Sequence, residues 1–202
     1  MCPFVIYLKP MQTHTDLINF LIEKYSYHAY LEIGVDDKHQ NFDKIRAEEK
    51  IGVDPNPSTL ADFIMTSDDF FTQNKKNFDI IFIDGLHHAD TAYRDIINSL
   101  KFLNPKGIIV CHDMNPLNEL SQKIPRETEK WNGDVWKAWV RLRSERSDLE
   151  MCVIDMDHGC GIIKAGTQKI IRLDHELTYD FFDNRRNELL NLISVEKALQ
   201  KI

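Results

Sequence analysis

Short apolar stretches alternate along the chain with segments of helical periodicity. The stretches predicted as strands are 29–34, 50–54, 63–66, 78–84, 108–113, 149–154 and 161–164. Helical segments are predicted to begin near Thr13, Asn41, Ser67, Ala89, Val135 and Thr178. The stretch 78–84 is nearly all apolar, which is typical of a strand covered on both faces in a parallel sheet. The alternation predicts a doubly wound α/β fold.

Turn-forming residues separate these elements. Pro55-Asn56-Pro57 ends the second strand, and residues 104–107 (Asn-Pro-Lys-Gly) are predicted as a turn. The last two strands are joined by a tight turn at 155–159, so we expect an antiparallel hairpin there. We predict one domain over 1–202, with a helical lead-in at 1–28, a core at 29–165 and a helical C-terminal segment at 166–202.

Composition excludes several classes of protein. Hydrophobic residues make up 43% of the 202 residues and charged residues 28%, which is typical of a globular chain rather than a disordered one. The net charge of −7, without a block of Lys or Arg, argues against nucleic acid as a partner. No apolar run approaches the roughly 18 residues that a membrane span needs.

The four cysteines, Cys2, Cys111, Cys152 and Cys160, form no CxxC motif. We expect reduced thiols in a cytoplasmic protein. The apolar start at 4–7 (Phe-Val-Ile-Tyr) is a candidate cover or homodimer contact, and the short lead-in suggests a domain of a larger glycan-assembly protein.

Polar residues recur where the predicted strands end. They are Gly34, Asp54, Ser67 with Asp68, Asp84 with Gly85, and Asp113. In an open α/β sheet these ends share one edge, and ligands bind there. A single Asp at a strand end more often caps the next helix, but a row of such residues on one edge favours a binding site.

The loop after the first strand constrains the ligand. It contains Gly34 but no GxGxxG, and it carries Asp36 and Asp37, which would repel a pyrophosphate. A nicotinamide cofactor is therefore disfavoured, and S-adenosylmethionine (SAM), which is positively charged and lacks phosphate, fits better. Its carboxylate would lie at the helix start near Asn41. Asp54, about 20 residues beyond Gly34, is placed to bind ribose hydroxyls, unless it only starts a turn.

A second group of residues suggests chemistry. Asp84 and Asp113 end neighbouring strands, and two close carboxylates favour a bridging cation such as Mg²⁺. His87, three residues after Asp84, is a candidate general base, the alternative being a surface or capping residue. His112 is either a third ligand or a hydrogen-bonding partner of one. His88 is interpreted as a surface or capping residue.

The acceptor side is predicted from the segment after the fifth strand. Trp131 and Trp136 offer aromatic faces for a sugar, and Asp134 offers a carboxylate for hydroxyls. Core packing is the alternative for either Trp. Asn115, two residues after Asp113, is added to the substrate side.

Four stretches within residues 29–116 resemble class I SAM-dependent methyltransferases, and more narrowly the macrocin-type sugar O-methyltransferases. They are Tyr30-Leu31-Glu32-Ile33-Gly34-Val35, Ile51-Gly52-Val53-Asp54-Pro55, Phe82-Ile83-Asp84-Gly85-Leu86-His87, and Leu103-Asn104-Pro105-Lys106-Gly107 leading into His112-Asp113. The later glycines of the family's first motif are replaced here by Asp36 and Lys38. The resemblance implies a Rossmann-like, seven-stranded, mostly parallel sheet with an antiparallel last strand and helices on both faces.

The resemblance also implies site roles. It places Glu32 and Gly34 near the methionine end of SAM, Asp54 at the ribose, and Ser67 and Asp68 near adenine, where the alternative is that they only cap a helix. Pro55, Asp84 and Gly85 complete the expected cofactor-binding set. It assigns Mg²⁺ to Asp84 and to the pair His112-Asp113, and the base to His87. His112 stands where the family commonly has an acid, so a metal-free reaction driven by His87 remains open.

The expected activity is therefore methyl transfer to a hydroxyl of a sugar, such as a deoxyhexose or glycan. The alternatives are another small hydroxylated acceptor, a catalytically silent module that binds cofactor or glycan, and a nicotinamide oxidoreductase.

Overall fold

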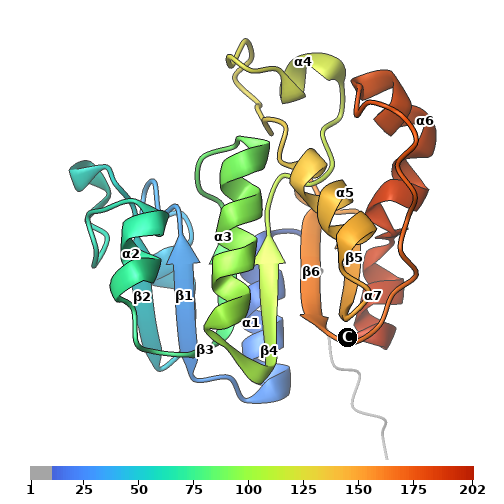
Figure 1. Ribbon diagram of the computed structural model, residues 1–202. Helices are drawn as coiled ribbons and strands as arrows, with labels where there is room; N and C mark the ends of the chain where they lie inside the picture. Colours follow the sequence, from blue (N-terminus) through green and yellow to red (C-terminus); the bar gives the residue numbers. More distant parts are fainter. Residues whose placement is uncertain (1–10) are drawn as a thin grey trace, which may run out of the picture.

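The computed structural model describes residues 11–202 as one seven-stranded sheet between two layers of helices (Figure 1). The strands are β1 (Ala29–Ile33), β2 (Glu49–Val53), β3 (Phe78–Ile83), β4 (Leu103–Cys111), β5 (Leu149–Ile154), β6 (Cys160–Ala165) and β7 (Leu192–Ile193). The helices are α1 (His14–Tyr25), α2 (Ser67–Gln73), α3 (Ala89–Lys101), α4 (Glu119–Gln122), α5 (Trp136–Glu145), α6 (Tyr179–Leu190) and α7 (Val195–Lys201). The doubly wound fold class is confirmed.

The sheet has the strand order β2-β1-β3-β4-β6-β5-β7. Only β6 runs against its neighbours, β4 and β5. The antiparallel strand is thus the sixth along the chain and lies inside the sheet. A short seventh strand, β7, follows it and pairs in parallel with β5. The predicted hairpin of β5 and β6 is confirmed.

Alternating side chains of the strands build two cores. On one face, Ile81 and Ile83 of β3 pack with α2, α3, α5 and α6. On the other face, Ile80 and Phe82 of the same strand pack with α1 and α7. Because β3 is covered on both sides, its residues are almost all apolar, as its sequence predicted.

Three predicted local structures differ from the observed ones. The stretch 63–66 is not a strand but a single bridge between Val53 and Phe63, because its neighbour β2 ends at Val53. The turn predicted at 104–107 lies inside β4, where the pairing with β3 shifts register. The short helix predicted near Asn41 is a 3₁₀ turn, Phe42–Lys44.

Several other expectations concern exposure and the chain start. Cys111, Cys152 and Cys160 are free and buried. Among residues 11–202 no helix combines the length and apolar character needed to cross a bilayer. Cys2 and the candidate dimer contact at 4–7 lie outside the described residues.

Candidate active site

A pocket of about 620 Å³ opens at the carboxyl edge of the sheet. It is lined by nine residues predicted from the sequence: Gly34, Asp54, Pro55, Ser67, Asp68, Asp84, Gly85, His87 and Trp131. These residues follow β1, β2 and β3 or begin α2, except for Trp131, which comes from the loop after α4. The row of strand-end residues therefore does converge on one cavity.

Gly34 brings the ends of β1 and β3 together. Its φ is +85°, and a Cβ atom there would lie 2.2 Å from the carbonyl oxygen of Asp84. Backbone hydrogen bonds fix the contact on both sides: Gly34 N donates to Val53 O (2.9 Å), and Asp84 N donates to Ile33 O (2.9 Å). Only glycine combines this conformation with this approach.

Asp54 holds the loop that follows β1. Its Oδ2 accepts from the backbone N–H groups of Val35 (3.0 Å) and Asp36 (3.1 Å), and its Oδ1 accepts from Asn56 N (2.8 Å). A carboxylate has about four acceptor positions, so three are used within the protein. One acceptor position is left for a ligand in the pocket.

Glu32 lies in an adjoining pocket of about 470 Å³, which shares Gly34, Asp36 and Asp84 with the first. Its carboxyl group accepts hydrogen bonds from the Tyr30 hydroxyl and from Asn41 Nδ2 (2.9 Å). Burial raises the pKa of Glu32 to about 8, although both hydrogen bonds act in the opposite direction. Glu32 is therefore mostly neutral at pH 7.

The far end of the larger pocket contains a carboxyl group that the sequence did not single out. Asp95 of α3 is 1% exposed, and its Oδ1 accepts from Ser67 Oγ (2.5 Å). Ser67 is not the cap of α2, because Thr66 occupies that position. Asp68 pairs at the surface with Arg94 (3.2 Å).

We expect Asp95→Asn to stabilise the ligand-free protein at pH 8 and to have little effect at pH 4. Burial raises the pKa of Asp95 to about 6 from an ordinary 3.8, so the contribution of Asp95 to stability is largest below pH 4 and is lost as pH rises through 6. The gain at pH 8 should be roughly 2–3 kcal/mol, measured by denaturant unfolding at both pH values. Asp90→Asn, at an exposed position of the same helix, is the control and should shift little. An equal gain at both pH values would contradict the prediction.

His87 lies between the two predicted carboxylates. Its Nε2 is 3.2 Å from Asp84 Oδ1, and its Nδ1 is 3.3 Å from Asp113 Oδ2 and 3.1 Å from the Trp131 carbonyl oxygen. The imidazole stacks on the Trp131 ring with centroids 5.2 Å apart. Asp113 Oδ1 accepts a hydrogen bond from Asn132 Nδ2 (2.7 Å). The predicted catalytic residues are thus brought together.

The charges of this cluster shift its pKa values. Burial would raise the pKa of Asp84, but the imidazoles of His112 and His87 hold it well below its usual range. Burial would lower the pKa of His87, yet its hydrogen bond to Asp84 and the charges of Asp84 and Asp113 raise it. Burial raises the pKa of Asp113. The cluster therefore favours a proton on an imidazole.

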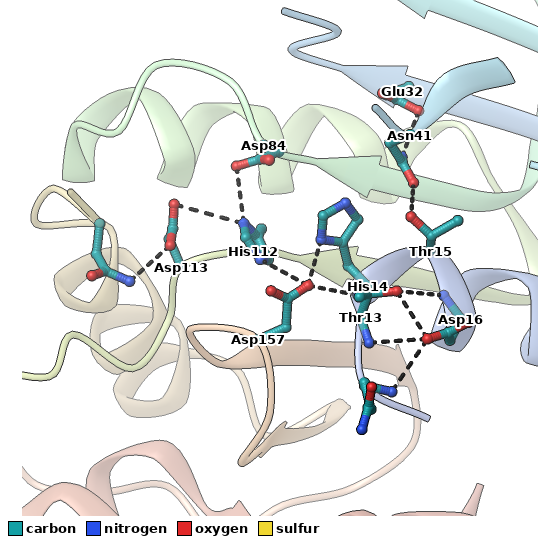
Figure 2. A network of polar contacts seen from close by, with 12 residues as sticks. Thr13, His14, Thr15, Asp16, Glu32, Asn41, Asp84, His112, Asp113 and Asp157 are labelled. Atoms are coloured by element: carbon teal, nitrogen blue, oxygen red, sulfur yellow. Dashed lines mark hydrogen bonds and ion pairs between the residues drawn. The ribbon is translucent and has the colours of Figure 1, made fainter. Parts of the chain in front are cut away.

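His112 extends the cluster towards the start of α1 (Figure 2). Its Nδ1 lies 3.4 Å from Asp84 Oδ1, and its Nε2 lies 3.5 Å from Asp157 Oδ2. Asp157, in the turn between β5 and β6, also accepts from the backbone N of His14 (2.7 Å) and lies 2.7 Å from its Nδ1.

The residues predicted to hold Mg²⁺ do not suit that ion as they are arranged. Mg²⁺ takes oxygen ligands in a near-octahedral shell, whereas His87 stands between the carboxylates of Asp84 and Asp113 and His112 adds a second imidazole. Imidazole suits transition metals better. The observed arrangement of these residues therefore does not favour a Mg²⁺ site.

Of the four residues predicted to bind the acceptor, only Trp131 lines the larger pocket. Trp131 lines the pocket beside His87. The prediction that Trp136 faces the acceptor is wrong. Trp136 is fully buried, packs on Phe182 with ring centroids 4.3 Å apart, and belongs to the core. Its spacing to Trp139 and Val140 on α5 is the helical signal that indicates core packing.

Asp134 and Asn115 are both engaged in hydrogen bonds within the protein, and their assignment to the substrate stays a prediction. Asp134 Oδ1 accepts from Ala89 N (2.7 Å) at the start of α3, and its Oδ2 lies 3.2 Å from Lys137. Asn115 is buried, donating to Asp155 and accepting from Arg186. Neither residue lines the larger pocket.

His14 and Asp157 are site residues that the sequence prediction missed. A helix that precedes a strand through a short turn runs antiparallel to it, so the start of α1 lies at the carboxyl edge of β1. The turn after β5 lies at the same edge, because β5 runs parallel to β4. The order of helices and strands therefore places both residues at the edge of the sheet where the site lies.

Comparison with known proteins agrees with this geometry. Residues 22–114 match the family described as "Methyltransferase domain", a little under half of the chain. No curated protein matches the chain.

Solved structures match more of the chain, at low sequence identity. A Podospora anserina methyltransferase, PaMTH1, solved with S-adenosylhomocysteine (SAH), is 16% identical, covers 75% of this chain and 77% of its own, and has a TM-score of 0.56. A putative caffeoyl-CoA O-methyltransferase from Staphylococcus aureus is 17% identical over 75% and 82% of the two chains, with a TM-score of 0.57. The Streptomyces achromogenes O-methyltransferase TomG, solved with SAM, is 13% identical over 75% and 78%, with a TM-score of 0.55. The chain thus has the Rossmann-like fold of the class I methyltransferases.

Proposed function

We propose that this chain is a SAM-dependent O-methyltransferase that acts on a sugar hydroxyl. The observation that carries the proposal is one continuous pocket that runs from Asp54 and Ser67 to His87. The methyltransferase-domain match and neighbours of the same fold that hold SAM or SAH support it.

The chemistry of the pocket suits SAM. Asp54 has a free acceptor position for a ribose hydroxyl, and the Ser67 to Asp95 end offers polar atoms for adenine. The adjoining pocket, with Glu32 and Asn41, would receive the methionine part. Bound SAM supplies an electrophilic methyl group on a sulfonium, whose charge suits a wall formed by acids.

His87 would act as the general base. As the methyl group moves in line to the acceptor oxygen, the acceptor O–H bond breaks and its proton passes to an imidazole nitrogen. Asp84 and Asp113 stabilise the resulting imidazolium. Contacts of 3.2 and 3.3 Å between His87 and these carboxylates are long for charge-assisted hydrogen bonds, so an acceptor hydroxyl can displace one of them.

Trp131 supplies the reason for a sugar acceptor. Its ring lines the mouth of the pocket, stacked on His87 and faced by Arg126 at 5.8 Å. Such an aromatic face can cover the apolar side of a sugar and leave its hydroxyls to Arg126 and His87. A phenolic ring could also stack there, so other small hydroxylated acceptors are the second candidate.

Calorimetry with SAH and NAD tests the cofactor. We expect SAH to bind with a micromolar Kd and NAD to show no binding, because Asp36 and Asp84 line the pocket and would repel a pyrophosphate. Asp54→Ala should weaken SAH binding by tenfold or more. Asp43→Ala, at an exposed acid that lines neither pocket, is the control. Binding of NAD in place of SAH would overturn the proposal.

A methyl-transfer assay over a panel of deoxyhexoses, glycans and phenols tests the acceptor. Transfer to sugars would support the proposal. Transfer to phenols alone would replace the sugar by the second candidate. SAH binding without transfer to any member would favour a silent binding module.

A further inference from the structure

Three residues from distant segments meet beside the catalytic cluster. His14 begins α1, His112 follows β4, and Asp157 lies in the turn between β5 and β6. Asp157 Oδ2 lies 2.7 Å from His14 Nδ1 and 3.5 Å from His112 Nε2, and the two imidazoles meet edge to face with centroids 4.6 Å apart. Figure 2 shows Asp157 between the two rings.

His112 is the unusual member of this group. Its side chain is only 10% exposed, and both ring nitrogens are buried without a hydrogen bond. A buried polar group without a partner is costly. Asp84 and Asp157 lie at 3.4 and 3.5 Å, which is too far for good hydrogen bonds to the two nitrogens. A ligand between His112 and Asp157 would satisfy Nε2.

We propose that His14, His112 and Asp157 bind a divalent transition-metal ion of the Zn²⁺ type. Two imidazoles and one carboxylate suit such an ion rather than Mg²⁺. The possible ligand atoms lie within 4.8 Å of one another. Ligand atoms of a tetrahedral Zn²⁺ are roughly 3.3 Å apart, close to the 3.5 Å between His112 Nε2 and Asp157 Oδ2.

The site is distinct from the group of Asp84, His87 and Asp113. Both nitrogens of His87 have hydrogen-bond partners, Asp84 and the Trp131 carbonyl, whereas neither nitrogen of His112 has a hydrogen-bond partner among the described residues. His14 and Asp157 also line the pocket of about 470 Å³, so an ion can reach them. The inference does not depend on the methyltransferase activity, since it uses no bound SAM and no acceptor.

Titration of the full chain with Co²⁺, followed by its visible absorption and by native mass spectrometry, tests the site. We expect one ion per chain, displaced by Zn²⁺. His14→Phe keeps a ring to stack on Phe82, which His14 contacts at 5.1 Å, but removes the nitrogen. Asp157→Asn keeps a residue type that tolerates the φ of 44° at this position. Each variant should weaken Co²⁺ binding by tenfold or more.

The matched control is His39→Ala. His39 lies 2.6 Å from Asp43 in an exposed pair that resembles His14 and Asp157 but is not part of a group of three possible metal ligands among the described residues. This variant should bind Co²⁺ as the parent does. Circular dichroism confirms that each variant is folded, and Asp157→Asn serves if His14→Phe is not.

Two results would overturn the proposal. One is a parent protein that binds no Co²⁺. The other is binding that survives both His14→Phe and Asp157→Asn but is lost in Asp84→Asn, which would place the ion at the catalytic carboxylates.

Discussion

Replacing His87 by Ala is expected to lower turnover by about 100-fold or more while SAH affinity stays within about twofold. The reason is that His87 is the imidazole placed between Asp84 and Asp113, where a proton from the acceptor can be received and its charge stabilised. Initial rates of methyl transfer give the turnover, and calorimetry gives the SAH affinity.

The pH profile supplies a second readout of the same role. A general base must be neutral, and hydrogen bonding to Asp84 together with the charges of Asp84 and Asp113 raises the pKa of His87 above the ordinary 6.5, against the effect of burial. We therefore expect kcat/KM to fall as pH decreases through a value above 6.5. Because the cluster titrates as a unit, this value belongs to the cluster as a whole. This fall of kcat/KM at low pH should disappear in the His87→Ala variant.

His88→Ala is the control for both measurements. His88 is the next residue along the chain and precedes α3, but its side chain makes no capping hydrogen bond and does not line the larger pocket. Turnover and pH profile should remain those of the parent. If His87→Ala retained full turnover, the assignment of the base would be wrong.

Gly34→Ala is expected to abolish measurable SAH binding and to destabilise the fold by several kcal/mol. The new Cβ would lie 2.2 Å from Asp84 O and 2.6 Å from Gly85 Cα, both backbone atoms that cannot rotate away. The φ of +85° adds strain for any residue with a Cβ. Relief would require β1 and β3 to separate at the edge where Asp54, Asp84 and the pocket are built. Thermal unfolding and SAH calorimetry measure the two effects.

Gly85→Ala is the matched control, because it adds the same methyl group on the other side of the same contact. Its Cβ would meet Ile33 Cγ2 at 3.5 Å and Asp95 Oδ2 at 3.6 Å, which are ordinary contacts. We expect this variant to fold with little loss of stability. Equal destabilisation by both substitutions would show that the close approach at Gly34 is not the cause.

The part of the site that follows buried strands could be predicted from the sequence. Gly34 and Asp84 each follow an apolar stretch that forms a central strand, Asp54 follows the neighbouring edge strand β2, and parallel strands bring such residues to one edge. The fold class follows from the same pattern, because β1, β3 and β4 are long enough and apolar enough to be recognised.

The remaining errors share a physical cause, which is that tertiary contacts override local signals. The turn residues at 104–107 are incorporated in β4, where Asn104 Nδ2 donates to Asp79 (2.7 Å). The stretch 63–66 has strand-forming residues, but β2 ends at Val53, so only Phe63 finds a pairing partner. Of the aromatic residues after the fifth predicted strand, Trp131 lines the pocket and Trp136 lies in the core. The helical spacing of Trp136 to Trp139 and Val140 on α5 places Trp136 on the buried face of that helix.

The two adjoining pockets are lined in part by residues that lie outside the segment matched to the methyltransferase domain. The segment that matches the methyltransferase domain, 22–114, includes the strands that carry Asp54, Asp84 and Asp113, but His14 precedes it and Trp131 and Asp157 follow it. A truncated protein cut at those limits would lose β5, β6 and β7 and the Trp131 ring that stacks on His87. Family boundaries therefore make a poor guide to the smallest working unit of this molecule.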